Sequence, residues 1–517
     1  MSDVLQRILK ASAPLTLSGV PAGFLPWLAG DLARAAHGTG SGGRAIVIAA
    51  DEAAMRALAD TVPVFAPEVE VLSLPAWDCL PYDRSSPALR VMAERMATLH
   101  ALQAPRQGPQ LLVATANAAT QRLVTPFRVR QLTRRLAESE RIERDALERL
   151  LTANGYQRTD AVHDAGEYAV RGSIVDLFPA GEPNPIRLDF FGDEIETMRR
   201  FDPADQRTTG PAEAFTLMPA SEALIDEESI KRFRTRYREE FGATATGDPL
   251  YQAISEGRRL AGMEHWLPLF EERLATLFDH LDEQDVILRD AGVDGALDAR
   301  QEGIQDYFSN RERAMVAEPG SYRPLSPSAL YLTPNEWRDA IAERMVHLAS
   351  PFHEPESDRV IDFGVDPARD FAPERAQNAN IYDVVIAHVA KLRKNKHKVV
   401  LASYSAGARE RLTGLLEEHG LKSVKQVRTW QEALGAKTEA ALMVLPLDHG
   451  FTSAEVAVLT EQDMLGDRLV RRKKRRKSAD AFLAELAALT PGDLVVHADH
   501  GIARYEGLTS IQVGKAP

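Results

Sequence analysis

The 517-residue chain contains a single cysteine, Cys79. One thiol excludes an intrachain disulfide and any zinc site built from several cysteines. No apolar run approaches the roughly 18 residues that a membrane-spanning helix needs. The first residues, MSDVLQRILKASAPLTL, also lack the apolar core of a signal peptide. These absences predict a cytoplasmic protein without a membrane partner, in which Cys79 is a buried or incidental thiol.

The chain has fewer basic than acidic residues: 62 Lys and Arg compared with 75 Asp and Glu, which gives a net charge of −13. Such a surface does not favour general binding of polyanions. Seven basic residues nevertheless stand together, namely Arg471, Arg472, Lys473, Lys474, Arg475, Arg476 and Lys477. A run of this kind is typical of a solvated linker, and contact with phosphates or an acidic surface is the alternative.

An intact phosphate-binding loop is also missing. The segment TLSGVPAGFLPWLAG (16–30) lies where such a loop would join a first strand to a first helix. The loop requires G-x-x-x-x-G-K-[ST], in which the lysine reaches the phosphates and the hydroxyl holds magnesium. Counted from Gly19, those positions carry Phe24, Leu25 and Pro26. We therefore expect no ATP, no other cofactor and no catalytic residue in this chain.

Three weaker motifs have simpler explanations. HGTGSGGR (37–44) precedes its strand, whereas a dinucleotide fingerprint must follow one. Asp51-Glu52 resembles an acidic helicase motif, but a helix N-cap explains Asp51 more simply. His497, Asp499 and His500 lack a fourth ligand nearby, so we expect no metal there.

The order of apolar runs predicts an α/β multidomain chain. Buried strands such as RAIVIAA (44–50) and QLLVATA (110–116) alternate with helices, as in a parallel sheet. Closely spaced strands with Gly and Pro turns then interrupt this pattern and indicate an inserted domain. The predicted divisions are an α/β domain in two parts (1–125 and 219–352), an inserted small α+β domain (126–218), a linker (353–380), a second α/β domain (381–468), a basic linker and helix (469–490) and a strand-rich module (491–517).

The run Arg187-Leu188-Asp189-Phe190-Phe191 has an unusual alternation. Side chains of a strand alternate between its two faces, so Leu188 and Phe190 suit a core while Arg187, Asp189 and Phe191 share the other face. An exposed aromatic beside arginine has the composition of a protein-docking hot spot. The alternative is a phenylalanine covered by an arginine stem.

Several motifs together resemble the N-terminal half of the bacterial transcription-repair coupling factors (Mfd). They occur in order along the chain, and the middle ones also resemble the excision-repair protein UvrB. The motifs are LPAWDCLPYDRSSP (74–87), GEYAVRGSIVDLFPAG (166–181), RLDFFGDEIETMRRFDPADQRT (187–208), LTEQDMLGDR (459–468) and GDLVVHADHGIARYEGL (492–508).

The resemblance implies a layout and a set of partners. The α/β domain would be helicase-like (RecA-like) with a degenerate nucleotide site, and the inserted domain would bind UvrA. The tail would begin a small β-barrel that binds the RNA polymerase β subunit. We expect the ATP- and Mg-dependent motor that moves the family along DNA to lie beyond Pro517, and the truncated tail to be doubtful as a polymerase-binding site.

The resemblance also implies which residues contact UvrA. Arg171 in AVRGS, Arg187 in PIRLD and Phe191 in DFFGD match the UvrA-binding positions of the family. The predicted function is a non-catalytic adaptor that recruits UvrA to stalled RNA polymerase. The alternatives are a UvrB-like excision-repair ATPase or helicase, and a DNA-binding module acting through residues 471–477.

Overall fold

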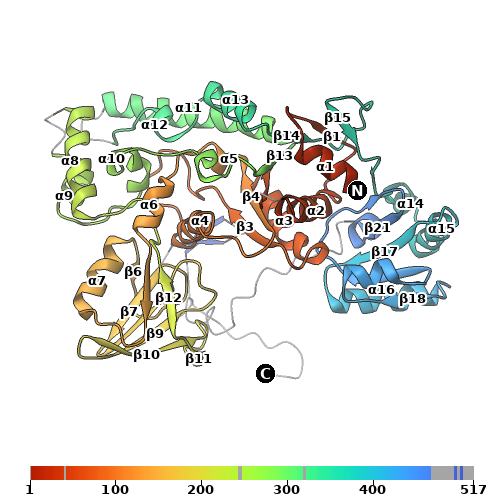
Figure 1. Cartoon of the computed structure of the whole chain (residues 1–517), viewed down its shortest axis with the longest axis horizontal. Helices are drawn as coiled ribbons and strands as arrows, with labels where there is room; N and C mark the ends of the chain where they lie inside the picture. The colour runs from red at the N-terminus through yellow and green to blue at the C-terminus, as the bar shows by residue number, and fades with distance from the viewer. Residues whose placement is uncertain are drawn as a thin grey trace.

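The computed structural model describes residues 2–39, 42–242, 247–317, 322–466, 494–497 and 501–504 (Figure 1). Two large sheets and one inserted β unit lie side by side, with helices between and around them. No helix among the described residues is long and apolar enough to cross a membrane. The basic run 471–477, Asp499 and His500 lie outside the described residues.

The first sheet has seven parallel strands in the order β15-β1-β14-β13-β2-β4-β3. Its central strands are continuous apolar runs because both of their faces are buried. The chain leaves the sheet after β4 and returns at β13. The strands are β1 (Thr16–Ser18), β2 (Ala45–Ala49), β3 (Glu70–Leu74), β4 (Gln110–Thr115), β13 (Val286–Asp290), β14 (His347–Ala349) and β15 (Val360–Asp362).

Helices cover this sheet on both sides. The first group precedes the inserted unit: α1 (Ser2–Leu9), α2 (Leu25–His37), α3 (Glu52–Phe65), α4 (Leu89–Ala101), α5 (Ala116–Ala119) and α6 (Pro126–Gln131). The second group follows it: α8 (Glu227–Phe241), α9 (Pro249–Ser255), α10 (Leu267–Phe270), α11 (Val293–Ala317), α12 (Pro327–Leu330) and α13 (Pro334–Glu343). The predicted N-cap at Asp51 is confirmed, since its carboxylate accepts from the Ala54 backbone N–H at 2.8 Å.

The inserted unit is a six-stranded sheet in the order β11-β10-β9-β8-β7-β6, with a separate β12-β5 pair. One face packs on α7 (Arg144–Ala153) and on the β12-β5 pair through buried Leu147, Phe190 and Phe215. The strands are β5 (Arg134–Ala137), β6 (Gln157–Arg158), β7 (Glu167–Arg171), β8 (Ile174–Leu177), β9 (Ile186–Phe191), β10 (Glu194–Phe201), β11 (Thr208–Pro211) and β12 (Ala214–Leu217).

The third large element is a six-stranded sheet in the order β16-β20-β21-β17-β19-β18. Its parallel strands are β17 (Lys398–Ser403), β18 (Val424–Gln426), β19 (Ala440–Val444) and β21 (Val456–Thr460), and its antiparallel edge is β16 (Asp366–Pro367) and β20 (Phe451–Thr452). Its helices are α14 (Ala372–Ala376), α15 (Ile381–Lys394), α16 (Ala406–Glu418), α17 (Trp430–Gly435) and α18 (Glu461–Leu465).

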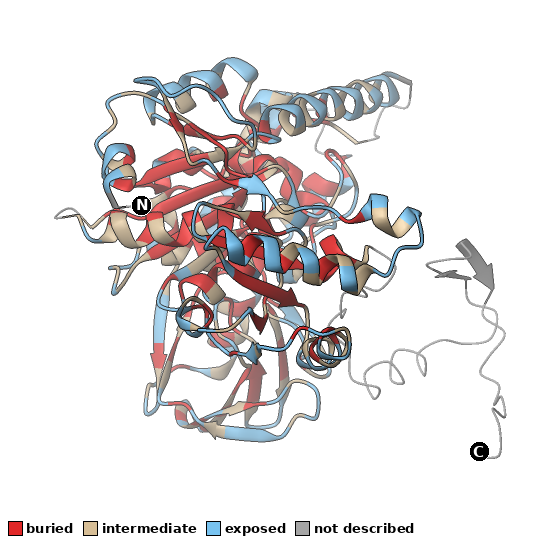
Figure 2. Ribbon diagram, turned by 90° about the vertical axis from the view of Figure 1, so that its right-hand side faces the viewer, coloured by how far each residue is buried: buried red, intermediate tan, exposed pale blue. Residues whose placement is uncertain are grey.

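The first and third sheets share one core. Residues of α2 and α3 form a single buried cluster with β17, β19 and β21. The Trp430 ring meets Trp27 at 5.1 Å and Phe65 at 4.8 Å between ring centroids. Figure 2 shows that the strands are buried while the outer helices expose one side. α2 lies between two sheets and is therefore buried on most of its surface.

The segment 353–380 contains more than the linker that its composition predicts. β15 extends the first sheet by pairing with β1, and β16 extends the third sheet by pairing with β20. The two strands have only three and two residues, so their pairing partners rather than their own sequences determine them. The described part of the tail is an antiparallel pair of β22 (Leu494–His497) and β23 (Gly501–Arg504).

Candidate docking site

The predicted alternation along β9 is confirmed. Ile186, Leu188 and Phe190 are buried, whereas the Phe191 side chain is 78% exposed. The turn that follows is Gly192, whose φ of +62° lies in the left-handed region that favours glycine. Phe191 therefore projects from the end of a strand whose opposite face is anchored in a core.

Strand register brings the three predicted residues onto one face. Arg171 on β7 pairs with Ile174 on β8, and Ile174 pairs with Asp189 on β9. Arg187 and Phe191 flank Asp189 at two-residue spacing, which keeps them on its face. We call this the docking face: Arg171, Ile174, Asp176, Arg187, Asp189 and Phe191. With strands about 4.8 Å apart, its width from β7 to β9 is about 10 Å.

Arg187 is fixed by a buried partner on the same face. Its Nε and Nη2 atoms donate to the two carboxylate oxygens of Asp176 at 2.7 and 2.9 Å. Its guanidinium also lies 4.8 Å from the centroid of the buried Phe201 ring. Hydrogen bonding to Asp176 raises the pKa of Arg187. The side chain therefore forms a rigid shelf with its charge already paired.

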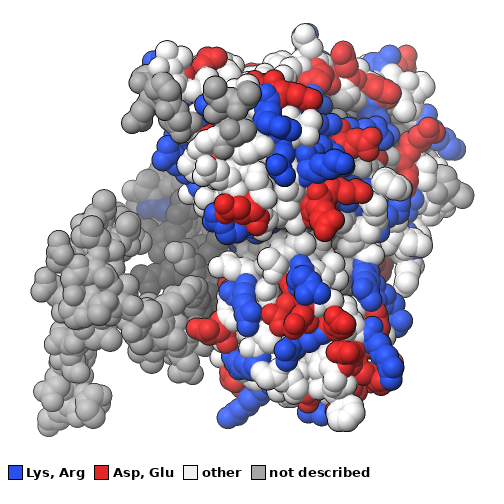
Figure 3. Space-filling view, turned by 90° about the vertical axis from the view of Figure 1, so that its left-hand side faces the viewer, with Lys and Arg blue, Asp and Glu red and all other residues white. Residues whose placement is uncertain are grey.

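Arg171 is held more loosely. It is exposed, and its Nη2 atom donates to the Asp160 carbonyl oxygen. The guanidinium fork presents five donors in all, so most of them remain available to a carboxylate. Figure 3 shows positive and negative side chains interspersed over the lower lobe, which is the inserted unit. The docking face thus offers one adaptable cation and one exposed aromatic ring beside a fixed shelf.

Asp176 and Phe201 were not predicted from the sequence. A lone carboxylate between Val175 and Leu177 in an apolar strand was the available signal, since a buried carboxylate requires a partner. The partner itself depends on the register between β8 and β9, which the sequence does not state.

The degenerate loop is closed by the fold. The Gly19 and Val20 backbone N–H groups donate to the carbonyls of Phe352 and Ser350 at 2.9 and 2.8 Å. Phe24 is buried, with its ring 5.4 Å from the Phe451 ring of the third sheet. Leu25 and Pro26 are buried in the first turn of α2. The amides that cradle phosphate in a functional loop are therefore used by the protein itself.

The third sheet also covers the start of α2. A Cβ atom on Gly23 would clash with the carbonyl oxygen of His449. The residues therefore do not fit a nucleotide at this helix N-terminus.

Cys79 has a histidine neighbour that the sequence did not reveal. Its sulfur lies 3.9 Å from His265 Nε2, across 186 positions of the chain. Burial raises the pKa of the Cys79 thiol to about 12 and lowers that of His265 to about 4. A neutral thiol beside a neutral imidazole is the reverse of an activated pair. The interpretation of Cys79 as a buried or incidental thiol agrees with this geometry, although the residue is only partly buried.

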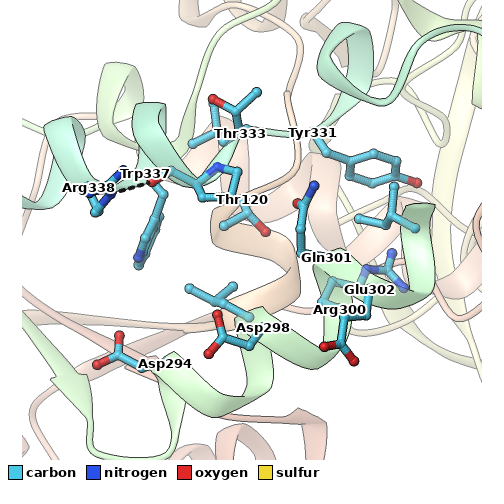
Figure 4. Close-up of a pocket in the computed structure, with 14 residues that line it drawn as sticks. Thr120, Asp294, Asp298, Arg300, Gln301, Glu302, Tyr331, Thr333, Trp337 and Arg338 are labelled. Atoms are coloured by element: carbon cyan, nitrogen blue, oxygen red, sulfur yellow. Dashed lines mark hydrogen bonds between the residues drawn. The ribbon is translucent and has the colours of Figure 1, made fainter. Parts of the chain in front are cut away.

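A cavity of about 590 Å³ lies between α11, α13 and the segment 331–333 that leads into α13. Figure 4 shows Asp294 and Asp298 of α11 on one side and Thr333 and Trp337 on the other. Arg300 lies 5.6 Å from the centroid of the Tyr331 ring at its end. Among the described residues no group of three or more His, Cys, Asp or Glu could hold a metal. The lining thus supplies scattered polar groups without a convergent set.

Comparisons with known proteins match three segments of the chain. Residues 135–222 match a family model described as the UvrB interaction domain. Residues 392–464 match the Mfd D3 domain, and residues 489–517 match the CarD-like/TRCF RID domain. These matches define a class: a DNA-repair protein with a UvrB-like interaction domain inserted into a mixed α/β structure.

Curated relatives narrow the class. Each of the following is named transcription-repair-coupling factor. The Haemophilus influenzae protein is 33% identical over 86% of this chain and 38% of its own length. Those of Escherichia coli and Myxococcus xanthus are each 31% identical over 91% of this chain and 40% and 41% of their own lengths.

Over most of its length the chain is similar to the N-terminal portion of the transcription-repair coupling factors. It spans about two fifths of the length of these relatives. The resemblance predicted from the sequence is confirmed.

Proposed function

We propose that this chain is an adaptor that recruits UvrA through the docking face for transcription-coupled excision repair. The observation that carries the proposal is Phe191, 78% exposed on the docking face of a UvrB-like interaction domain. An aromatic anchor beside arginine is the usual composition of a binding hot spot. Arg171 would pair with a carboxylate of the partner, and the Arg187 shelf would support the ring.

The surrounding α/β unit would be a RecA-like domain that has lost its nucleotide. Its parallel sheet and its helix after β1 favour that ancestry, and the closed loop at Gly19 to Pro26 supports the loss. In this proposal the unit is a scaffold without ATPase activity, cofactor or catalytic residue. The UvrB-like ATPase alternative would require an open loop with free amides.

The tail would contribute to polymerase contact. Residues 489–517 match the RID model, and β22 pairs with β23 as the first hairpin of a small β-barrel would. Binding to the RNA polymerase β subunit and DNA translocation driven by ATP and magnesium are proposed for the longer family protein.

The decisive experiment measures UvrA binding to Phe191→Ala. We expect affinity to fall by at least about 30-fold, equivalent to about 2 kcal/mol for a lost hot-spot anchor. Phe352→Ala is the matched control, because Phe352 is 73% exposed but lies outside the inserted unit. The readout is surface plasmon resonance with immobilised UvrA. Full UvrA binding by the Phe191 variant would overturn the proposal.

A further inference from the structure

A second charged surface lies far from the docking face, at the start of the third sheet. Residues 384–409 contain no Asp or Glu, although the whole chain carries net negative charge. Five basic residues of this stretch surround the turn between α15 and β17. We call them the basic turn: Lys391, Arg393, Lys394, Lys396 and Lys398.

The fold directs all five basic side chains outward. Val389 and Leu392 are buried in the core beneath α15, so this helix has a fixed orientation. The five side chains are exposed. Lys396 has a φ of +67°, which makes the turn tight. Lys398 Nζ donates to the Leu434 carbonyl, and this contact brings exposed Lys437 close to the basic turn.

Few acidic groups offset this charge. In the described part of the chain, none of the five residues forms an ion pair. Glu455 lies beside Lys398, since its carbonyl accepts from the Lys398 backbone N–H at 2.8 Å. Glu439 lies at the same sheet edge, but its carboxylate accepts from the Lys422 and Ser423 backbone N–H groups at 3.1 Å. The basic turn therefore carries a clear excess of positive charge.

Helix stabilisation explains only part of this charge. Basic residues in a last helical turn interact favourably with the helix dipole, which accounts for Lys391, Arg393 and Lys394. Lys396 and Lys398 lie beyond the helix and gain nothing from it. The basic turn also contains no exposed aromatic or large apolar side chain to anchor a protein partner or to stack on an unpaired base.

From these observations we infer that the basic turn binds the phosphate backbone of duplex DNA without reading its sequence. Flexible lysines around a convex turn suit closely spaced phosphates, and duplex DNA carries one charge per about 1.7 Å of its axis. The site shares no residue with the docking face or with the basic run 471–477. It would hold the repair adaptor close to the duplex on which its partner works.

Fluorescence anisotropy of a labelled 30-base-pair duplex with the full chain tests the inference. The variant is Lys391→Gln, Lys394→Gln and Lys396→Gln, because among the described residues none of these three side chains forms a hydrogen bond or an ion pair. The matched control is Lys231→Gln, Arg234→Gln and Arg273→Gln, which removes the same charge from exposed residues elsewhere. A third protein carries glutamine throughout residues 471–477.

The basic-turn variant should bind the duplex at least about tenfold more weakly at 50 mM salt. Its salt slope should fall by about 2 to 3, since each lost phosphate contact contributes about 0.9. The matched control should change affinity less than twofold. The inference is wrong if the wild-type chain does not bind the duplex, if the basic-turn variant binds normally, or if only the 471–477 variant loses binding.

Discussion

At the scale of residues, Arg187 has two roles: it lies on the docking face, and its pair with Asp176 stabilises the inserted unit. Asp176 is buried, and its carboxylate has Arg187 as its hydrogen-bond partner. Removing one member of a buried ion pair leaves the other charge desolvated and unpaired. A binding defect in an Arg187 variant would therefore combine a lost contact with a disturbed strand.

We predict that Arg187→Ala lowers the free energy of unfolding of the inserted unit by about 2 to 3 kcal/mol. The double variant Asp176→Leu, Arg187→Met should recover much of that stability, because it leaves no buried charge, yet should still bind UvrA weakly. Hydrogen exchange in β8 and β9 reports the stability, and surface plasmon resonance reports the binding. Equal protection in wild type and Arg187→Ala would contradict the structural role of the pair.

At the scale of elements, the start of α2 shows that the residues replacing the phosphate-loop motif have a structural role. Phe24 packs between Phe363 and Phe451, whose rings belong to segments more than 300 positions away. Phe24, which stands at the glycine position of the motif, is thus part of a core that joins two sheets. Substituting the motif residues back would open a cavity in this core. The backbone N–H groups of Gly19 and Val20 would still be hydrogen-bonded within the protein.

We predict that Phe24→Gly, Leu25→Lys, Pro26→Thr does not bind ATP. Replacing buried Phe24 should also cost about 3 to 5 kcal/mol of stability, as other large-to-small core changes do. Isothermal titration with Mg-ATP gives the first result and thermal unfolding the second. Micromolar ATP binding by this variant would show that the loop remains open to nucleotide.

The same elements show what a sequence can predict. The alternation of Arg187 to Phe191 follows from the two-residue period of a strand, so the face on which Phe191 lies was predictable, whereas its exposure was not. The Asp51 cap and the buried run of β2 are equally local. The Asp176–Arg187 pair, the Cys79–His265 contact and the pairing of β15 depend on register or long-range topology. Local sequence patterns therefore could not predict them.

At the scale of the whole molecule, three histidines are buried in the first α/β unit, namely His265, His280 and His347. Burial lowers the pKa of His265, His280 and His347 to about 4. For His347 and His280 the geometry favours the neutral form, because in each ring Nδ1 faces a donor and a protonated ring has no acceptor. His347 Nδ1 accepts from the Leu15 backbone N–H at 3.0 Å, and His280 Nδ1 lies 3.3 Å from the Gln103 Nε2 donor.

These lowered pKa values predict an acid-sensitive fold. The unfolded chain takes up a proton at each histidine as the pH falls through about 6.5, whereas the folded chain does so only near 4. The free energy of unfolding therefore falls between about pH 6.5 and 4, by about 2 kcal/mol per histidine at pH 5. Carboxylates add to this loss, so the test requires a variant that changes one histidine.

We expect His347→Gln to lower stability at pH 7 but to reduce the further loss between pH 7 and 5. Glutamine can still accept from Leu15 but takes up no proton in this range. His163→Gln is the matched control, because His163 is exposed and should leave the pH dependence unchanged. Thermal midpoints across this range provide the measurement. Parallel curves for wild type and His347→Gln would mean that this imidazole is not held neutral in the folded chain.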